Sequence, residues 1–305
     1  MPDVAVLGVF VADTAYRAAR PPRLGETVLG DSFALGPGGK GSNQAVAAAR
    51  AGASTAMLTR LAPDAFGALA RATWEGAGVT AEVIEAEGYT GAAYIFVESG
   101  TGQNAIIVAP GVAGDIAEAD VAHWAPVIRA ARVFVTQLEQ PLPAALAALR
   151  TAREAGVLTI LNPAPAPPLP PGMLALCDWV TPNETEAEAL TGIAVADPAS
   201  AERAARALAG QGAGTVVVTL GANGALLLHG GEATHVPAMR AGPVAETTGA
   251  GDAFTGGLAA ALAEGRAPLD AVRFATATAA ISVTRPGTAP SMPARAEIDA
   301  LLARG

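Results

Sequence analysis

The segment GPGGKGSNQAVAAARAG places Lys40 among glycines and then continues into an alanine-rich helical pattern. Because glycine has no Cβ, a backbone of this kind can come close to a ligand while one lysine reaches it. We therefore take Lys40 as a candidate for ligand binding. A flexible turn before a helix capped by Ser42 explains the same residues, and this segment alone does not decide between the two.

A second glycine cluster, ETTGAGDAFTGGLAAAL, places Asp252 in the first turn of a predicted helix, directly after the turn Gly249-Ala250-Gly251. Unpaired N–H groups and a partial positive charge make a helix N-terminus suitable for a phosphate oxyanion. A carboxylate beside that phosphate can accept the proton of an attacking hydroxyl. The alternative is that Asp252 only interacts favourably with the helix dipole.

Two common phosphate-binding motifs do not occur in the sequence. There is no G-x-x-x-x-G-K-[ST] loop, because Lys40 is followed by glycine and Ala34 occupies the place of the first glycine. No G-x-G-x-x-G follows the first predicted strand. A NAD-dependent dehydrogenase therefore lacks its dinucleotide fingerprint in this chain.

Composition narrows the class of protein further. The chain of 305 residues has 51% hydrophobic and 15% charged residues, which is typical of a compact globular protein with a large core. Its net charge of −9 argues against binding to nucleic acid and favours small ligands. Cys177 is the single cysteine and excludes an intrachain disulfide, in keeping with a reducing cytoplasm. We expect the N-terminus MPDVAVLGVF to be a first strand and no membrane segment.

Short apolar runs alternate with alanine-rich helical stretches along the chain. This order predicts an α/β fold with a mostly parallel sheet flanked by helices on both faces, with ligands beyond the carboxyl ends of the strands. We expect strands over 4–11, 131–138, 158–164, 179–183 and 215–221. We expect helices over 42–51, 64–77, 143–155, 184–191, 199–210, 252–264 and 268–283.

Two segments, 12–35 and 88–110, break this alternation. The second reads YTGAAYIFVESGTGQNAIIVAP around its core, which predicts two strands joined by a Gly-rich turn. We therefore predict a small antiparallel β lid formed by both segments and inserted into an α/β body. That body comprises 1–11, 36–87 and 111–305, and its Pro-rich stretch 162–172 is interpreted as a rigid loop.

The two glycine clusters together resemble the paired signatures of the ribokinase-like (PfkB) carbohydrate kinases. Their separation is also similar to that in the family, and the resemblance covers nearly the whole chain in order. The further matching motifs are GETVLG (25–30), TQLEQPL (136–142), LNPAPA (161–166), TPNETEAEALTG (181–192), VTLGANG (218–224) and VTRPGTAPSMP (283–293).

The resemblance implies an ATP-dependent kinase that phosphorylates a primary hydroxyl of a small sugar, with D-ribose as the first choice. It implies that Asp252 is the general base and that Gly249, Ala250 and Gly251 direct N–H groups at the transferring phosphoryl group. Lys40 and Asn43 match residues that bind sugar hydroxyls. The full set of sugar-binding positions is Val11, Asp13, Gly39, Lys40, Gly41, Asn43, Glu139 and Asp252.

The resemblance also implies three ions or cofactors, namely ATP, Mg²⁺ and K⁺. Asn183 and Glu186 match the N-x-x-E pattern that helps to place Mg²⁺ and the phosphates, through water. The nucleotide positions are Asn183, Glu186, Thr219, Gly221, Gly224, Gly251 and Thr276. The K⁺ positions are Glu246, Thr248, Ser282, Arg285, Gly287 and Ser291, with Glu246 in place of the usual aspartate.

The chain departs from the family at two places near the sugar. Val11 stands where the N-x-D pattern of the family has asparagine, and PGVAGD replaces the common P-G-A-N. Because valine neither donates nor accepts a hydrogen bond, another pentose, a ketohexose or a nucleoside stays open as the substrate. A non-catalytic sugar sensor is the alternative from another class. We also expect a homodimer formed through the lid, whose edge strands need cover.

Overall fold

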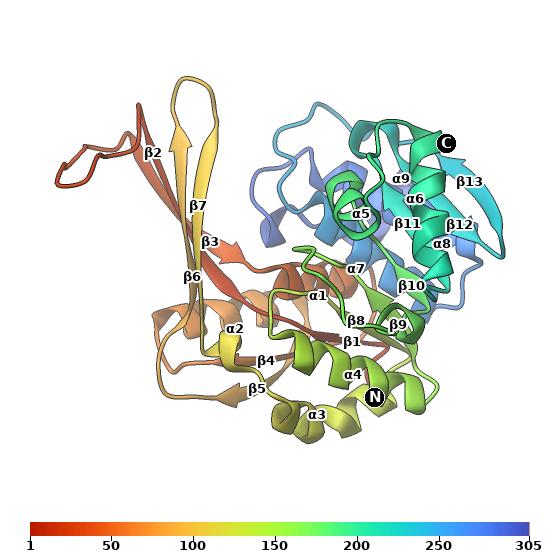
Figure 1. Cartoon of the computed structure of the whole chain (residues 1–305). Coiled ribbons are helices and arrows are strands. Elements are labelled where there is room, and N and C mark those ends of the chain that lie inside the picture. Colours follow the sequence, from red (N-terminus) through yellow and green to blue (C-terminus); the bar gives the residue numbers. More distant parts are fainter. Residues whose placement is uncertain (305) are drawn as a thin grey trace.

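A nine-stranded sheet forms the centre of the molecule in the computed structural model, which describes residues 1–304 (Figure 1). Its strand order is β13-β12-β11-β10-β9-β8-β1-β4-β5, and all neighbours run parallel except the pairs β11–β12 and β12–β13. The strands are β1 (Val4–Leu7), β4 (Thr55–Leu61), β5 (Val79–Glu85), β8 (Val133–Thr136), β9 (Leu158–Leu161), β10 (Trp179–Val180), β11 (Thr215–Thr219), β12 (Ala225–His229) and β13 (Glu232–Val236).

Helices cover both faces of this sheet, as the sequence predicts. They are α1 (Lys40–Arg50), α2 (Ala65–Ala77), α3 (Glu118–Ala130), α4 (Leu142–Glu154), α5 (Glu184–Thr191), α6 (Pro198–Gly210), α7 (Ala250–Ala263), α8 (Pro268–Ser282) and α9 (Arg295–Leu302). Alternate residues of one strand enter different cores. In β1, Val4 and Val6 belong to the core that also contains residues of α1, α7 and α8, whereas Ala5 and Leu7 belong to the core that also contains residues of α3, α4 and α6.

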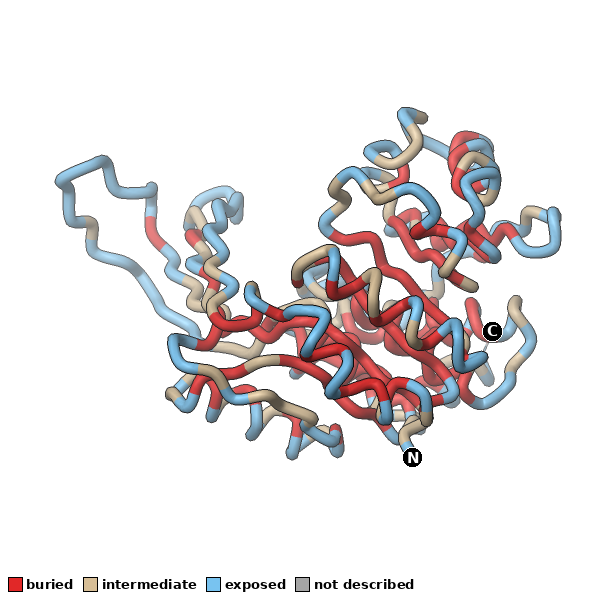
Figure 2. Tube along the Cα trace, turned by 60° about the horizontal axis from the view of Figure 1, so that its bottom comes forward, coloured by how far each residue is buried: buried red, intermediate tan, exposed pale blue. Residues whose placement is uncertain are grey.

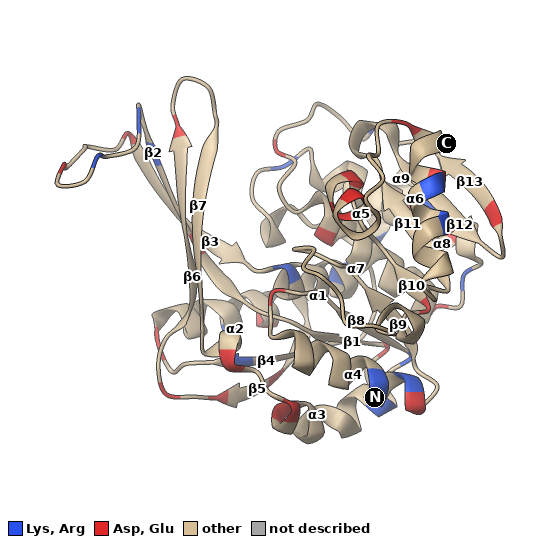
Figure 3. Ribbon diagram, in the orientation of Figure 1, with Lys and Arg blue, Asp and Glu red and all other residues tan. Residues whose placement is uncertain are grey.

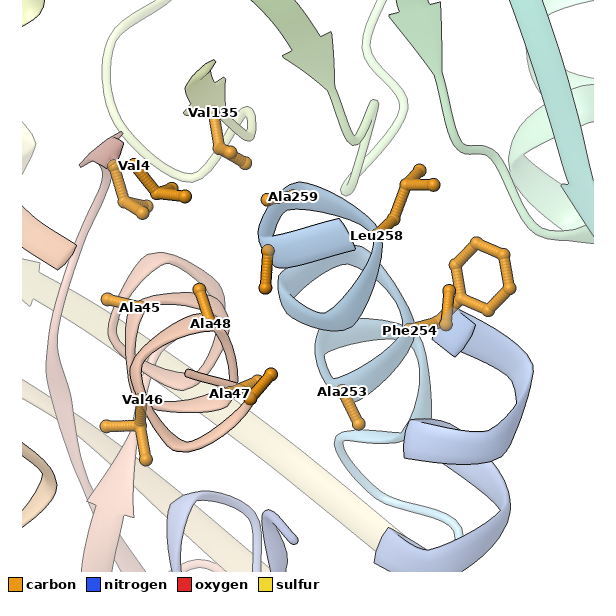
Figure 4. Close-up of a cluster of buried hydrophobic side chains, with 14 of the residues drawn as sticks. Val4, Ala45, Val46, Ala47, Ala48, Val135, Ala253, Phe254, Leu258 and Ala259 are labelled. Carbon is orange, nitrogen blue, oxygen red and sulfur yellow. The ribbon is translucent and has the colours of Figure 1, made fainter. Parts of the chain in front are cut away.

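Helices α1 and α7 lie side by side on one face, with mostly small side chains between them (Figure 4). Gly256 of α7 makes this contact possible, because a Cβ on it would lie 2.5 Å from the Ala47 Cβ and 2.5 Å from the Gln44 carbonyl oxygen of α1. The close approach brings the first turns of both helices, and the polar residues on them, into one neighbourhood.

A second, four-stranded sheet extends away from the body (Figure 1), and much of its length is exposed (Figure 2). Its order is β3-β2-β6-β7, from the strands β2 (Val11–Ala18), β3 (Ser32–Gly38), β6 (Thr90–Glu98) and β7 (Asn104–Gly111). The predicted hairpin β6–β7 is antiparallel, and so is β2–β3. The middle pair β2–β6 is parallel, so the predicted antiparallel sheet is mixed. Strands that are far apart in sequence meet here, which is why their direction was not readable locally.

All seven predicted helices are present, each with ends within two residues of the prediction. The predicted first strand 4–11 is divided, because β1 ends at Leu7 and β2 begins at Val11 in the other sheet. The segment 162–172 contains no strand or α-helix, in keeping with a loop. Among residues 1–304, no helix combines the length and the apolar character that crossing a membrane requires.

Candidate active site

A cavity of about 140 Å³ lies beyond the carboxyl ends of β9, β10 and β11, between these strands and the start of α7. This is the edge at which an α/β sheet is expected to bind ligands. Lys40 reaches it from the first turn of α1, the helix beside α7. Its lining is Lys40, Asn162, Thr181, Asn183, Glu186, Thr219, Thr247, Gly249, Ala250, Gly251, Asp252 and Thr255.

Asp252 lies in the first turn of α7 and is 6% exposed. The helix begins after Gly249, whose φ of 80° is the left-handed conformation that favours glycine. The Ala250 N–H, one of the three predicted to face the phosphoryl group, donates instead to the Thr247 carbonyl at 3.2 Å, whereas the N–H groups of Gly251, which was predicted, and of Asp252, which was not, have no backbone acceptor within residues 1–304. These two amides are therefore free for an anion in the cavity.

Both oxygens of the Asp252 carboxylate accept hydrogen bonds from α1. Asn43 Nδ2 donates to Oδ2 at 3.0 Å, and Gln44 Nε2 donates to Oδ1 at 3.0 Å. Burial raises the pKa of Asp252, and the Lys40 charge and these two amides oppose that rise. The carboxylate is thus held in a fixed orientation at the cavity wall.

The glycines around Lys40 serve close packing of the chain on itself. Gly39 has a φ of 87°, and a Cβ on it would lie 2.5 Å from the Val9 carbonyl oxygen. A Cβ on Gly41 would lie 2.7 Å from Gly8 Cα, so only glycine at both positions lets α1 approach the end of β1 this closely. Ser42 does not cap the helix, and its hydroxyl accepts a hydrogen bond from Trp74 Nε1 at 2.9 Å. The Ser42 cap of the alternative interpretation is therefore wrong.

Carboxyl groups surround the Lys40 ammonium, which forms no ion pair within 4.0 Å in the described part of the chain. Burial lowers the pKa of Lys40, but the charges of Asp252, Glu139 and Glu186 together raise it by a larger amount, so the net shift is upward. Burial raises the pKa of Glu139 to about 7, against the opposing Lys40 charge and the hydrogen bond from the Lys40 N–H at 2.8 Å. Burial, with the charges of Asp252 and Glu246, raises the pKa of Asp13 to about 6.

One buried acceptor beside Asp252 has no partner. Asn43 is 3% exposed and gives its amide N–H to Asp252, while its Oδ1 accepts no hydrogen bond from any described residue. Buried polar atoms are normally paired, so this oxygen is suited to a hydroxyl donor from a ligand.

Val11 lies two residues before Asp13 on β2, hence on the same face of that strand, and is 5% exposed.

Among the predicted nucleotide residues, Asn183, Glu186, Thr219 and Gly251 line the cavity. Asn183 and Glu186 form a capping box at the start of α5, with the Glu186 N–H bonded to Asn183 Oδ1 at 2.8 Å and the Asn183 N–H bonded to Glu186 Oε2 at 2.9 Å. The motif therefore has a structural role besides the one that the resemblance implies. Burial raises the pKa of Glu186, which the Asn183 N–H and Lys40 oppose.

Other predicted nucleotide residues lie outside the cavity lining. Gly221 and Gly224 form the turn between β11 and β12, both with positive φ, and a Cβ on Gly224 would lie 2.1 Å from the Val236 carbonyl oxygen. The Thr276 hydroxyl donates to the Val272 carbonyl within α8 at 2.8 Å.

The predicted cation residues come from two segments that meet. Glu246 Oε2 accepts a hydrogen bond from the Gly287 N–H at 2.8 Å, and the Glu246 N–H donates to the Val283 carbonyl at 3.2 Å. The Arg285 guanidinium pairs with Glu297 and leaves only its backbone for an ion. The remaining predicted positions, Thr248, Ser282 and Ser291, lie on these two segments, and the hydroxyls of Ser282 and Ser291 bond to the carbonyls of Ala279 and Thr288.

Sequence reasoning missed several polar residues of this site. Asn162, Thr181, Thr247 and Thr255 line the cavity. Gln44 bonds to Asp252 without lining the cavity. Asn162 and Thr181 lie in the second half of the predicted strands 158–164 and 179–183 and directly follow the observed strands β9 and β10. Polar residues near those strand ends were a usable signal, since the ends share one edge.

A buried carboxylate at a helix N-terminus, an adjacent pair of amides without acceptors and a cavity at the carboxyl edge of a parallel sheet are features that a phosphoryl-transfer site requires. Residues 1–295 match the model of the pfkB family of carbohydrate kinases. The chain belongs to this family and is a carbohydrate kinase.

Similar sequences and a similar structure agree with this assignment. The chain is 38% identical over 296 residues to a ribokinase of Haemophilus influenzae, covering 96% of each sequence. It is 35% identical over 294 residues to a deoxyribokinase of Salmonella typhi, covering 95% of each. The structure is similar to that of Arabidopsis thaliana ribokinase complexed with ribose and ATP, with a TM-score of 0.91, 32% identity and coverage of 99% of this chain and 98% of the other.

Proposed function

We propose that the protein transfers the γ-phosphoryl group of ATP to the primary hydroxyl of D-ribose and releases D-ribose 5-phosphate and ADP. The observation that carries this proposal is Asp252, a buried carboxylate with fixed orientation at the cavity and beside the free amides of α7. Ribokinases are among the relatives that match over nearly the whole chain.

In the proposed reaction, Asp252 accepts the proton of the hydroxyl as its oxygen attacks the γ-phosphorus. A new O–P bond forms, and the bond between that phosphorus and the oxygen bridging to the β-phosphate breaks. The amides of Gly251 and Asp252 and the Lys40 ammonium stabilise the charge on the equatorial oxygens. Asn43, Asp13 and Glu139 hold the sugar hydroxyls.

The residues that line the cavity fit a Mg²⁺ ion that binds together with the nucleotide and is held through water molecules. Residues 1–304 contain no group of three or more His, Cys, Asp or Glu side chains that could hold a metal by themselves. Mg²⁺ in kinases typically uses one or two carboxylates with waters and substrate phosphates, and Glu186 at the cavity wall supplies one carboxylate. When bound, Mg²⁺ would neutralise phosphate charge. Glu246 and the neighbouring backbone of 283–287 would hold K⁺.

The direct test is incubation with ATP, Mg²⁺ and a panel of sugars and nucleosides, with detection of ADP and of the phosphorylated product. Turnover of D-ribose with product phosphorylated at the primary hydroxyl is the expected result. ATP and sugar binding without any ADP formation would instead favour a non-catalytic sensor.

A second substrate, 2-deoxy-D-ribose, is favoured by Val11. This side chain lies on the face of β2 that carries Asp13, and it offers a hydroxyl neither a donor nor an acceptor. A deoxyribokinase is also among the relatives. If the 2-hydroxyl of ribose lies against Val11, the deoxy sugar should have a kcat/KM about tenfold higher than ribose.

The Val11→Asn variant separates the two substrates. Asparagine supplies a hydrogen bond worth about 1.4 kcal/mol, so kcat/KM for D-ribose should rise about tenfold while that for 2-deoxy-D-ribose does not rise. Val11→Leu matches asparagine in shape without its polar atoms, and should leave the ratio of the two sugars unchanged. An unaltered ratio in Val11→Asn would place the sugar elsewhere than beside position 11.

We further propose that the four-stranded sheet is a lid over the sugar and pairs with the lid of a second copy. Strand register puts Tyr16, Phe33, Leu35, Tyr94 and Ile107 on one face, where each is at least 36% exposed. Tyr16 lies 5.1 Å from Phe33 and 5.5 Å from Tyr94 between ring centroids. A two-fold contact covers this apolar face on both copies with one geometry.

Sedimentation across micromolar concentrations tests the dimer. The wild type should sediment as a dimer and Phe33→Asp as a monomer. Val244→Asp is the matched control, because Val244 is 66% exposed but lies outside this sheet, and it should remain dimeric. A monomeric wild type would contradict the proposal. The cytoplasm is the proposed location, in keeping with the lone, buried Cys177.

A further inference from the structure

Gln44 contacts the proposed base without facing the cavity. Its side chain is fully buried and its Nε2 lies 3.0 Å from Asp252 Oδ1, yet the residue is absent from the cavity lining. Asn43, which bonds to the other carboxylate oxygen, has a free acceptor for a ligand. Gln44 has none, because its Oε1 is already bonded. Gln44 can therefore act on the reaction through the residues of the cavity wall that its amide contacts, and Asp252 is the one of these that is the proposed base.

A second buried glutamine fixes the orientation of Gln44. Gln137 Nε2 donates to Gln44 Oε1 at 2.7 Å, so the Gln44 amide nitrogen must point toward Asp252. The same nitrogen donates to Asn162 Oδ1 at 3.0 Å. If the Gln44 amide were flipped, its oxygen would face the carboxylate and its nitrogen would face the Gln137 nitrogen, and both contacts are repulsive.

Two glycines leave room for the Gln137 side chain, although its buried amide oxygen is unpaired. A Cβ on Gly8 would lie 2.3 Å from Gln137 Oε1, and a Cβ on Gly41 would lie 3.0 Å from it. Gln137 is fully buried, and its Oε1 has no hydrogen-bond partner among residues 1–304. A buried amide oxygen without a partner is destabilising and calls for a compensating role. Donating to Gln44 is such a role.

We propose that Gln137 and Gln44 form a two-amide relay that positions Asp252 as the general base, with Gln44 and Gln137 as positioning residues for the proposed phosphoryl transfer. The relay holds the Asp252 carboxylate in one rotamer and supplies a donor to its ionised form. It rests on the proposed function, because it acts through Asp252. It differs from that function in naming two fully buried residues that do not line the cavity.

The charges that face Asp252 make an added donor valuable. Lys40 is the cation near it, whereas Asp13, Glu139 and Glu186 are carboxyl groups in the same neighbourhood. An amide donor favours the ionised form of a carboxyl without adding charge. Loss of the Gln44 donor should therefore raise the pH at which activity appears.

The test is the pH profile of kcat for Gln44→Met and Gln137→Met, measured with the sugar that the wild type turns over. Methionine keeps the length of glutamine without a donor. Gln44→Met should lower kcat at pH 7 by about tenfold or more and move the acid limb up by about one pH unit, with sugar KM within about threefold. Gln137→Met should also lower kcat and move the acid limb up, by smaller amounts than Gln44→Met. The double variant should equal Gln44→Met, because the effect of Gln137 passes through Gln44.

Gln140→Met is the matched control. Gln140 is also buried, at 3% exposure, but it donates to Thr136 Oγ1 and to the Gln137 carbonyl and not to Gln44. Its acid limb should stay at the wild-type position. Three results would each overturn the relay. They are an acid limb of the pH profile that does not move in Gln44→Met, an equal shift of that limb in Gln140→Met, and additive shifts in the double variant.

Two further measurements keep the test independent of folding and of the proposed function. Gln44→Glu keeps shape and is expected to fold where methionine fails. It should move the limb further, because its carboxyl donates to Asp252 only while protonated. Carbon-13 titration of the Asp252 carboxyl in the sugar-free protein, assigned with Asp252→Asn, should show the same upward shift in the Gln44 variants. Wild type without turnover of any sugar refutes the function, whereas an unshifted titration refutes the relay.

Discussion

Replacing Asp252 with asparagine removes the proposed base and keeps the size of the side chain. Without a proton acceptor, kcat should fall by about 10²- to 10⁴-fold, while sugar and ATP affinities should stay within a few-fold. The structure also sets a limit on the loss of stability. Asn43 and Gln44 each donate to one Asp252 oxygen at 3.0 Å, and asparagine offers only one oxygen. One buried donor is left without an acceptor, which costs about 1–3 kcal/mol.

A second effect opposes that cost, because burial raises the pKa of Asp252 and a neutral side chain escapes this penalty. The melting temperature should therefore change by less than about 5 °C in a chain of this size. ADP release gives kcat, and a thermal melt with an ATP-binding measurement accompanies it. Asp270→Asn is the matched control, since Asp270 lies in the first turn of α8 and outside the cavity lining, where it interacts with the helix dipole and, at 3.8 Å, with Arg273. If Asp252→Asn keeps more than about a tenth of wild-type kcat, Asp252 is no general base.

Three other outcomes are expected. Burial raises the pKa of Glu139 to about 7 and that of Asp13 to about 6, so the folded protein binds more protons than the unfolded chain above pH 4 and its stability should fall as pH rises toward 7. Glu139→Gln should flatten this fall in thermal melts recorded between pH 5 and 8, and a parallel curve would contradict the assignment. Gly41→Ala places a Cβ 2.7 Å from Gly8 Cα and should destabilise the protein by about 1–3 kcal/mol in denaturant titration, where an unchanged midpoint would refute the packing argument. Glu246→Asp should lose its hydrogen bond to a backbone N–H and change the K⁺ concentration for half-maximal activity by about tenfold, whereas an unchanged K⁺ dependence would remove Glu246 from the cation site.

Local patterns carried much of the fold because caps and periodicity are local. The start of α7 at Ala250, with Asp252 in its first turn, is marked by the glycine turn before it. Helix α3 was not predicted, because Pro126 lies inside it and interrupts the pattern. The edge strand β5 was not predicted either, since its sequence VTAEVIE is half polar. Both elements become stable through packing that the sequence alone does not display.

The site was predictable where a motif carries its own geometry and unpredictable where contacts are distant. Asp252 and Lys40 were found from glycine turns. Gln44 had no local signal, because it stands in an alanine-rich helix and its partner lies 208 residues further along the chain. The glycines near Lys40 were interpreted as permitting approach to a ligand. Their closest neighbours are Val9, Gly8 and Asp13, so they permit approach of α1 to the sheet edge and thereby place Gln44.

The charges of the site explain how it can take a neutral sugar and an anionic nucleotide together. Lys and Arg are scattered over the ribbon in Figure 3, and Lys40 is the single basic residue of the cavity lining. The pKa of Glu139 is raised to about 7, so near neutral pH this carboxyl occurs in both forms and can accept or donate a hydrogen bond, whereas Asp13, with a pKa raised to about 6, is mostly ionised there and accepts from hydroxyls. An anion is repelled by such groups. It is attracted only by Lys40 and by the free amides of α7, which cannot balance the charge of a triphosphate. We therefore expect the nucleotide to bring its own cation, which is a physical reason for the proposed use of ATP with Mg²⁺ at a site with so few basic groups.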